Sequence, residues 1–264
     1  MSTINEECVK YDECENELNV TFNWHNCVLH DSITTKRGTH IEMVSRPSFG
    51  LSCFMDNSIQ SSEYDEKKYH QFLVKNIFTK VSNPTKIKNM CIIGGGEGAT
   101  AREVLKYSSV EKVDMIEWDE EVVELFKNNY PQWANGAWND SRLHLEFKDA
   151  FEVANENRKY DAVIVDLFDP CPEMYEKWGD FISKISSWVE AGGAIVIYSG
   201  MDFLDIEGDT AIQKITKNAI QSSLNMWRNI PVEDDRWNSV CSDKVLIPSF
   251  MGQATFVRAF RKDY

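Results

Sequence analysis

The chain reads MCIIGGGEG over residues 90–98, and this stretch decides the fold. Its first four residues are apolar, as in a buried β-strand, and a helical pattern over Thr100–Tyr107 follows the glycines. Glycines between a strand and a helix allow a tight turn and let a ligand approach the backbone closely. The spacing is neither the GxGxxG of dinucleotide binders nor a P-loop, which ends in Lys and Ser or Thr. The stretch therefore favours a ligand-binding turn, and a purely structural strand-to-helix turn is the alternative.

Four further apolar runs lie downstream of the glycine loop and alternate with helical patterns. Asp119, between the first two runs, is a suitable N-cap for one of these helices. Strands that alternate with helices predict βαβ units and a mostly parallel sheet, and therefore an α/β fold. The expected strands are Val113–Glu117, Leu143–Phe147, Ala162–Val165 and Ala194–Tyr198.

Short β-favouring runs separated by turn residues precede the glycine loop, between residues 18 and 60. In His40–Val44, polar and apolar residues partly alternate, as in a half-buried strand, so this part predicts a small antiparallel sheet. A helical pattern follows from Glu63 and ends before Ser82. We therefore expect an N-terminal β-domain over residues 1–72, with 1–17 flexible, and a Rossmann-like catalytic domain over 73–264.

Acidic residues exceed basic ones in this 264-residue chain, with 42 Asp and Glu against 28 Lys and Arg and a formal net charge of −14. Nucleic-acid binding needs clustered Lys and Arg for the phosphates, and no such cluster is present, so this class of partner is excluded. An acidic surface attracts small cationic partners instead. The alternative is that the charge only keeps the protein soluble.

The cysteine pattern and the apolar runs limit the environment of the chain. Seven cysteines occur singly with no CxxC pair, which argues against a disulfide framework and against a zinc site. The first residues are acidic rather than those of a signal peptide, and no apolar run approaches the ~20 residues of a spanning helix. We expect a cytoplasmic protein with no membrane partner.

Carboxylates stand at the ends of the first two strands that are expected after the glycine loop. Glu117 ends the strand after the glycine loop, where an acid accepts hydrogen bonds from ribose hydroxyls. Asp149 follows the next strand, where a carboxylate can accept from an adenine amino group. The alternatives are a solvated Glu117 and an Asp149 that caps the next helix. With the glycine loop, these acids indicate a nucleoside held over the carboxyl ends of a parallel sheet, and an S-adenosyl-type ligand fits because no phosphate-binding motif is present.

Two more acids, Asp166 and Asp169, follow the fourth strand of the predicted sheet. An ammonium has a pKa of ~10 and must lose a proton before its nitrogen can act as a nucleophile. A carboxylate beside it can bind the cation and take that proton. This spacing predicts an anionic pocket for an amine, and capping of the next loop or pairing with a Lys is the alternative.

The chain resembles the spermidine/spermine synthase family, the polyamine aminopropyltransferases. Residues 54–71 (FMDNSIQSSEYDEKKYHQ) are similar to the family signature LDGxxQxxExDExxYHE, and residues 94–104 (GGGEGATAREV) to GGGDGxxxREV. Residues 110–121 (VEKVDMIEWDEE) and 160–170 (YDAVIVDLFDP) resemble two further blocks in the family's order. Glu97, the Gln-Ser after Ile59 and Ile247–Phe250 resemble the thermospermine synthase branch.

This resemblance implies a Rossmann-like domain of the S-adenosylmethionine methyltransferase type and an aminopropyl transfer. The donor would be decarboxylated S-adenosylmethionine as co-substrate, and a small cationic di- or polyamine would accept the group and leave methylthioadenosine. Asp166 would be the base, helped by Tyr69, without a metal. Family members are usually homodimers or tetramers, so we expect a homo-oligomer. The implied donor-binding residues are Gln60, His70, Gly94, Gly96, Glu97, Glu117, Trp118, Asp149 and Ala150, and the acceptor-binding residues are Gln60, Tyr69, Asp166 and Asp169.

The acid at Glu97 separates two kinds of transfer. An intact S-adenosylmethionine carries a carboxylate, and like charges at short range cost free energy in a crevice of low dielectric. A decarboxylated donor presents an ammonium instead, so Glu97 favours aminopropyl over methyl transfer. The alternatives are an amine N-methyltransferase on the same scaffold and a catalytically silent polyamine-binding subunit.

Several residues depart from the family pattern. Asn57 replaces the signature glycine, Gln71 the terminal Glu, and Ala150 a glycine, while Thr39 stands near the position of a donor-contacting Gln. A small Ser-Ser pair between the two acids is replaced by Leu167-Phe168, which predicts a narrower or more apolar acceptor pocket.

Overall fold

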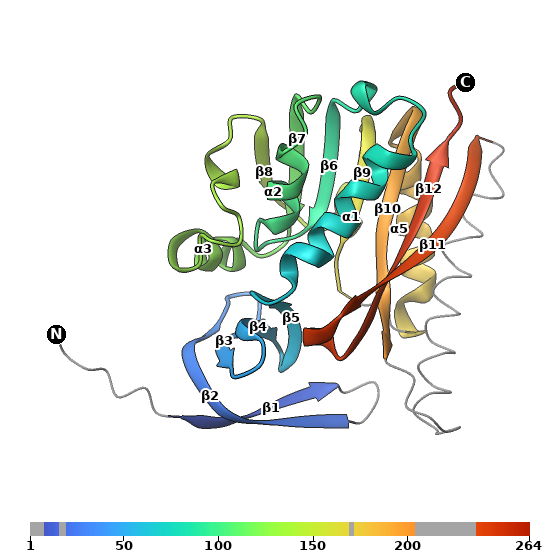
Figure 1. Cartoon of the computed structure of the whole chain (residues 1–264). Coiled ribbons are helices and arrows are strands. Elements are labelled where there is room, and N and C mark those ends of the chain that lie inside the picture. Colours follow the sequence, from blue (N-terminus) through green and yellow to red (C-terminus); the bar gives the residue numbers. More distant parts are fainter. Residues whose placement is uncertain (1–7, 16–19, 169–171, 204–235) are drawn as a thin grey trace, which may run out of the picture.

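Helix α1 (Glu66–Lys80) joins an N-terminal antiparallel sheet to a larger mixed sheet (Figure 1). The computed structural model describes residues 8–15, 20–168, 172–203 and 236–264. Within these residues, no helix is long and apolar enough to cross a membrane. The N-terminal antiparallel sheet and the mixed sheet with its helices confirm the predicted α/β fold.

The N-terminal sheet has five strands in sequence order, each antiparallel to its neighbour. Its first strand lies inside the segment 1–17 that was expected to be flexible, because residues 9–15 pair with the first half of the next strand. Asn57, which stands where the family signature has glycine, has a φ of 67°, a left-handed conformation that Asn adopts more readily than most residues. The strands are β1 (Val9–Glu15), β2 (Val20–Thr34), β3 (His40–Arg46), β4 (Gly50–Met55) and β5 (Ser58–Ser62).

The larger sheet has the strand order β11-β12-β10-β9-β6-β7-β8. The five strands from β10 to β8 are parallel, as predicted, and the antiparallel pair β11 and β12 extends one edge. The sequence patterns did not predict this pair. The strands are β6 (Asn89–Gly94), β7 (Lys112–Glu117), β8 (Leu143–Phe147), β9 (Tyr160–Asp166), β10 (Val189–Phe203), β11 (Trp237–Ile247) and β12 (Gly252–Arg261).

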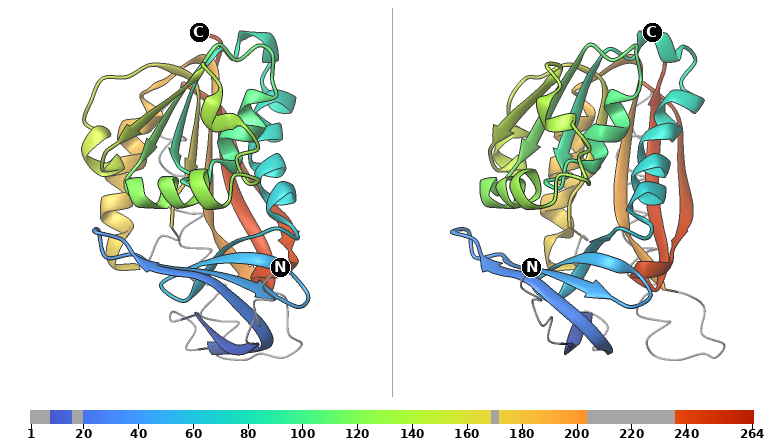
Figure 2. Two further views of the ribbon diagram at one scale, coloured as in Figure 1. Left: turned by 90° about the vertical axis from the view of Figure 1, so that its left-hand side faces the viewer. Right: turned by 60° about the vertical axis from the view of Figure 1, so that its left-hand side comes forward.

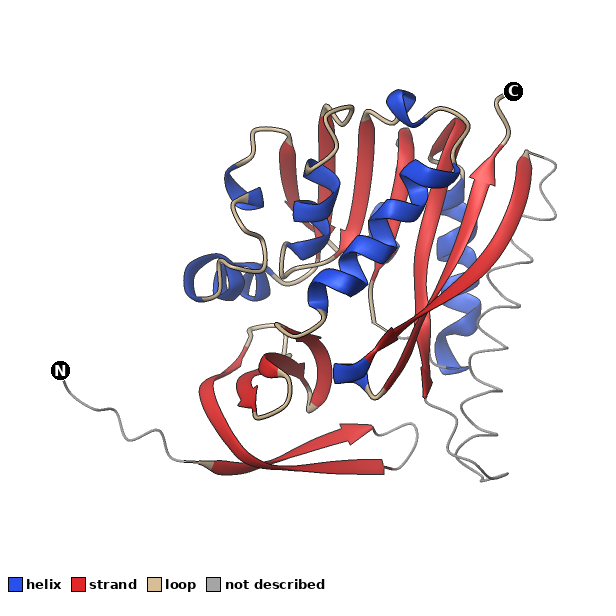
Figure 3. Ribbon diagram, in the orientation of Figure 1, coloured by secondary structure: helices blue, strands red, loops and turns tan. Residues whose placement is uncertain are grey.

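Helices cover both faces of the larger sheet (Figure 3). Successive residues of a strand point to opposite faces, so Ile92 packs in one core with α1 and α2 (Ala99–Leu105). Its neighbour Ile93 packs in the other core with α4 (Ala150–Val153) and α5 (Tyr175–Ser186). The central strands β6 and β9 are almost wholly buried, so they read as continuous apolar runs, and this made them visible in the sequence.

The chain leaves β6 in one direction along the sheet and returns to β9 on the other side, so β6 and β9 are neighbours. Open α/β sheets bind ligands at such a switch point, in the crevice at the carboxyl ends of the strands. Gly94 and Asp166 end these two strands and are paired in register. A Cβ atom on Gly94 would lie 2.2 Å from the carbonyl oxygen of Asp166, so only glycine fits here.

The N-terminal sheet lies against the carboxyl ends of the parallel strands (Figures 1 and 2). One face of it packs against α3 (Glu120–Asn129) and the segment after it, and Met43 and Cys53 belong to the same buried cluster as Phe126 and Trp133. Thr35 Oγ1 donates a hydrogen bond to Asp119 over 2.6 Å at the same junction. The sheet therefore closes the switch-point crevice from one side. The domain boundary expected between residues 72 and 73 falls inside helix α1. The buried face of the whole helix packs on the larger sheet, so α1 belongs with that sheet.

Short 3-10 helices complete the described elements. They are η2 (Pro84–Lys86), η3 (Ala137–Asn139), η4 (Pro172–Met174) and η5 (Pro248–Phe250).

Candidate active site

Asp166 is held at the switch point by hydroxyl groups from two helices. The Tyr69 hydroxyl of α1 donates to Oδ1 over 2.7 Å, and Thr100 Oγ1 of α2 donates to Oδ2 over 2.7 Å. Burial raises the pKa of Asp166, and these two hydrogen bonds lower it. Both oxygens therefore have fixed positions, and the carboxylate is a stronger base than an exposed aspartate.

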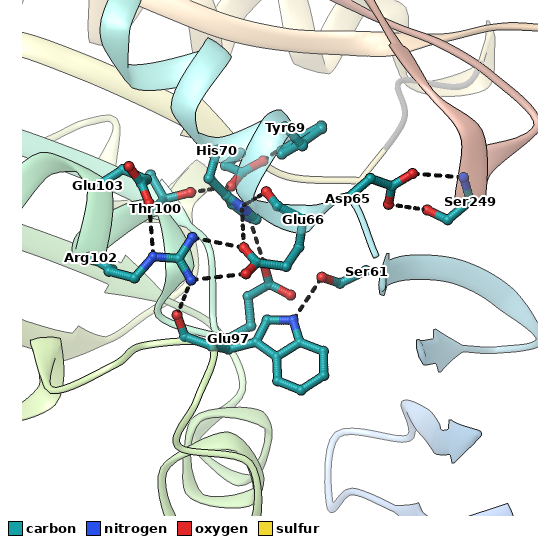
Figure 4. A network of polar contacts seen from close by, with 12 residues as sticks. Ser61, Asp65, Glu66, Tyr69, His70, Glu97, Thr100, Arg102, Glu103 and Ser249 are labelled. Carbon is teal, nitrogen blue, oxygen red and sulfur yellow. Dashed lines mark hydrogen bonds and ion pairs between the residues drawn. The ribbon is translucent and has the colours of Figure 1, made fainter. Parts of the chain in front are cut away.

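Glu97 lies in the glycine loop and faces His70 of α1. The distance between Glu97 Oε1 and His70 Nε2 is 2.6 Å (Figure 4). Burial raises the pKa of Glu97 well above its ordinary value, and the negative charges of Glu66 and Asp166 raise it further, while a hydrogen bond from Ser61 lowers it. Burial lowers the pKa of His70 well below its ordinary value. The pair is therefore an acid and an imidazole that both resist carrying charge.

A buried ion network supports this pair from the α2 side (Figure 4). Arg102 Nη1 and Nη2 donate to the two carboxylate oxygens of Glu66 over 3.1 and 2.8 Å. Its Nε donates to Glu103 over 2.8 Å, and its Nη1 also contacts the Trp133 carbonyl oxygen. A buried guanidinium that meets carboxylates in this forked geometry fixes both partners. Arg102 therefore holds the N-terminal part of α1, which carries Tyr69 and His70, against α2.

Glu117 ends β7 beside the glycine loop. Its Oε1 accepts hydrogen bonds from the backbone of Trp118 over 2.6 Å and of Asp119 over 3.1 Å. A Cβ atom on Gly96 would lie 3.0 Å from Glu117 Oε2, so glycine is what lets the loop lie so close to the carboxylate. Burial raises the pKa of Glu117 and the backbone N–H groups lower it. The ring of Trp118 is 45% exposed and lies under the Arg37 guanidinium at 4.7 Å.

Asp149 follows β8 and begins α4. Its Oδ1 accepts a hydrogen bond from the Phe151 backbone N–H over 2.8 Å, so the capping role that the sequence left open is confirmed. Ala150 is buried behind it. The adenine contact expected of Asp149 stays a prediction, and a carboxylate that caps with one oxygen keeps the other for a ligand.

Gln60 lies at the edge of the group formed by the other site residues. It is exposed, and its side chain donates to the Ser58 carbonyl oxygen over 3.3 Å. It nevertheless lines the same small pocket as Tyr69, His70, Ile247 and Phe250. Asp169 lies outside the described residues.

Leu167 and Phe168 follow the base. The Phe168 ring packs near Phe151 and Trp178, at centroid distances of 6.5 and 5.4 Å. Leu167 reaches toward Gly94, where a Cβ atom would lie 2.9 Å from its Cδ2. Phe168 therefore packs toward α4 and α5. The narrower or more apolar acceptor pocket that this pair led us to expect stays a prediction.

Several supporting residues carry no signal of their own in the sequence patterns. The motifs over residues 54–71 and 94–104 contain Ser61, Thr100 and Arg102. Helix or strand periodicity does not indicate which acid each of these side chains contacts. Asp65 accepts hydrogen bonds from the Ser249 backbone and hydroxyl over 2.8 and 2.6 Å, across 184 residues of sequence. This contact fixes η5 against the start of α1. Within the described residues no group of three His, Cys, Asp or Glu is placed to hold a metal ion.

The chain belongs to the spermine/spermidine synthase family, since the family's domain model matches residues 66–244. A protein of Saccharolobus islandicus, named polyamine aminopropyltransferase, is 35% identical over 207 residues, which are 76% of this chain and 67% of that protein. The crystal structure of spermidine synthase from Thermotoga maritima has a TM-score of 0.71 and 21% identity, and the match covers 97% of this chain and 80% of that one. A spermidine synthase in complex with the transition-state analogue AdoDATO has a TM-score of 0.73 and 22% identity, covering 97% and 81%.

The family assignment defines the class of the enzyme. The chain is a transferase of the aminopropyltransferase class, as its motifs indicated. The structural likenesses support the same fold over nearly the whole chain.

Proposed function

We propose that this protein transfers the aminopropyl group of decarboxylated S-adenosylmethionine to the terminal amine of a linear di- or polyamine. The observation that carries the proposal is Asp166, whose oxygens are fixed by Tyr69 and Thr100 at the switch point of the sheet. A carboxylate held in this way can bind an ammonium and accept its proton. Aligning two bound substrates supplies most of the remaining rate.

The donor is proposed to lie across the glycine loop. Glu117 accepts hydrogen bonds from the ribose hydroxyls, the free oxygen of Asp149 meets the adenine, and Glu97 meets the ammonium of the aminopropyl group. Gly94 and Gly96 let the loop lie close to Asp166 and Glu117, since a side chain at either position would meet one of these residues. The implied donor residues follow the same strand ends, since Trp118 comes directly after β7 and Ala150 begins α4.

The reaction follows from the two sites. The acceptor ammonium loses a proton to Asp166, and its nitrogen then attacks the aminopropyl carbon that is bound to the donor sulfur. The C–S bond breaks, its electron pair stays on sulfur, and methylthioadenosine leaves uncharged. The sulfonium is a good leaving group, so the residues need only position the substrates and take one proton. The Tyr69 hydroxyl, which donates to Asp166, orients the base.

The acceptor is proposed to enter through the pocket lined by Gln60, Tyr69 and Phe250. The rings of Tyr69 and Phe250 suit the methylene chain of an amine, and the carboxylate of Asp166, which accepts a hydrogen bond from Tyr69, suits its charged end. The motif likeness to the thermospermine branch favours a triamine acceptor. The homo-oligomeric state and the cytoplasmic location stay predictions.

Two measurements test the proposal. Calorimetry should show tighter binding of decarboxylated S-adenosylmethionine than of S-adenosylmethionine, because the carboxylate of the latter would be buried beside Glu97 without a cation of the protein to pair with. The reverse order would favour the N-methyltransferase alternative. Mass spectrometry of reactions with putrescine, spermidine and spermine then identifies the acceptor, and a spermidine preference is expected.

A further inference from the structure

His70 and Glu97 face each other between α1 and the glycine loop, and their contact defines where hydrogens lie. Their side chains are only 4% and 12% exposed. The second ring nitrogen of His70, Nδ1, lies 3.3 Å from the backbone carbonyl oxygen of Glu66. A carbonyl oxygen only accepts, so Nδ1 carries a hydrogen, and in a neutral imidazole Nε2 then carries none.

One proton must therefore lie between His70 Nε2 and Glu97 Oε1. Without it, two acceptors would face each other at 2.6 Å in a buried site, which costs free energy. With it, two unprotonated acceptors no longer face each other at this short distance, although the geometry of the contact is not that of an ordinary hydrogen bond and Glu97 Oε1 has no hydrogen-bond partner within the described residues. Both side chains are buried, and burial raises the pKa of Glu97 and lowers that of His70, so a neutral carboxyl group beside a neutral imidazole suits the site better than an ion pair.

The surroundings of the pair favour this state. Desolvation is the largest effect on both groups, nearby acids add to it for Glu97, and nearby cations add to it for His70. The groups that act on the pair are Glu66 of α1, Ser61 of β5, Cys53 of β4, Asp166 of β9, and Arg102 and Lys106 at α2.

We propose that the donor's ammonium takes the place of this shared proton, so that each donor molecule that binds releases one proton. The inference rests on the proposed function, in which Glu97 meets that ammonium. The O–H bond of Glu97 breaks, the proton passes to solvent, and the carboxylate pairs with the ammonium. His70 stays neutral, and its Nε2 accepts a hydrogen bond from the same ammonium.

The exchange makes His70 and Glu97 a selective device for a cationic tail. An ammonium supplies several N–H donors to the two acceptors that the lost proton leaves behind. A nucleoside with an uncharged tail supplies no such donor, so the proton stays in place. Over the pH range in which Glu97 of the free protein is protonated, the affinity for the donor should therefore rise with pH. The affinity for an uncharged analogue should not change with pH at this site.

Calorimetry near pH 7 in buffers of different ionisation enthalpy counts the protons released. Decarboxylated S-adenosylmethionine should release about one proton more than methylthioadenosine, which lacks the ammonium. Using the difference cancels proton changes at Glu117 or elsewhere in the nucleoside site. Equal proton counts for the two ligands would overturn the shared-proton inference while leaving the proposed function intact. A complete lack of donor binding would overturn both.

Two variants locate the proton. Glu97→Gln removes the acid that carries it, so the difference between the two ligands should fall to zero. Glu63→Gln is the matched control, because this exposed acid on the nearby loop contacts Gln132 and not the pair. The control should keep the wild-type difference, and a loss of the difference in the control but not in Glu97→Gln would contradict the assignment.

Discussion

The hydroxyl oxygen of Tyr69 and the Oδ1 atom of Asp166 lie 2.7 Å apart, although 97 residues separate them in the chain. The contact joins the helix that leads out of the N-terminal sheet to the end of a central strand of the larger sheet. The proposed base is thereby positioned by both parts of the fold. Because this contact positions the proposed base, substitutions that keep the size of either side chain should lower turnover more than they lower stability.

Replacing Asp166 by Asn keeps the shape of the side chain and removes the base. We expect kcat to fall by about 10²–10⁴, the usual contribution of a positioned general base, with donor affinity close to that of the wild type. Steady-state kinetics and donor calorimetry measure the two quantities. Tyr69→Phe, which removes only the orienting hydroxyl, should give a smaller fall. Equal losses of kcat and donor affinity in Asp166→Asn would contradict the role as base.

The pH dependence of kcat should report the carboxyl group of Asp166. Because burial raises its pKa, the rising limb of the profile should lie above the range of an ordinary aspartate, with activity lost at lower pH as the base is protonated. Thr100→Val removes a hydrogen bond that lowers this pKa, so it should move the limb to higher pH. Thr85→Val, at an exposed turn, is the control and should leave it in place. A limb that Thr100→Val does not move would count against the assignment.

Gly94→Ala should destabilise the protein strongly. The new Cβ atom would lie 2.2 Å from the Asp166 carbonyl oxygen, and the φ of 85° is unfavourable for any L side chain. Gly136→Ala is the matched control, since its φ is 91° but no atom lies within 4 Å of the new Cβ. The control should cost about 1–2 kcal/mol of unfolding free energy, and Gly94→Ala clearly more, in urea titrations. Equal costs would show that the approach to Asp166 is not what requires glycine.

Arg102→Met should remove the anchor of the first turn of α1. It leaves Glu66 buried without its cation, which typically costs about 3–5 kcal/mol of unfolding free energy. Lys88→Met, at an exposed pair with Glu111, should leave stability unchanged and serves as the control. Thermal or urea unfolding compares them. If Arg102→Met were as stable as the control, the network would not hold the helix.

Much of the fold and part of the candidate site could be predicted from the sequence. The sequence predicted the glycine loop from its composition. It predicted the parallel strands and helix α1 because buried strands and amphipathic helices leave clear apolar patterns. The pairing of β11 with β12 was not, because β11 has a largely half-exposed pattern and follows a long interval of sequence.

The contacts within the site were harder to predict than its members. Strand-end position placed Asp166 and Glu117 near the same crevice, but no periodicity indicates that Thr100 contacts Asp166 or that Arg102 contacts Glu66. Such pairs depend on how two helices cross, which is set by packing throughout the core. Asp149 shows a different limit, because one carboxylate can both cap a helix and bind a ligand.

The central claim, aminopropyl transfer, is tested most directly by product analysis. Purified protein would be incubated with decarboxylated S-adenosylmethionine and an amine from the panel, and both products measured by mass spectrometry over time. We predict methylthioadenosine and an amine longer by one aminopropyl group in equal amounts, and neither with Asp166→Asn. Absence of methylthioadenosine with every di-, tri- and tetra-amine, from protein that binds the donor, would contradict the account.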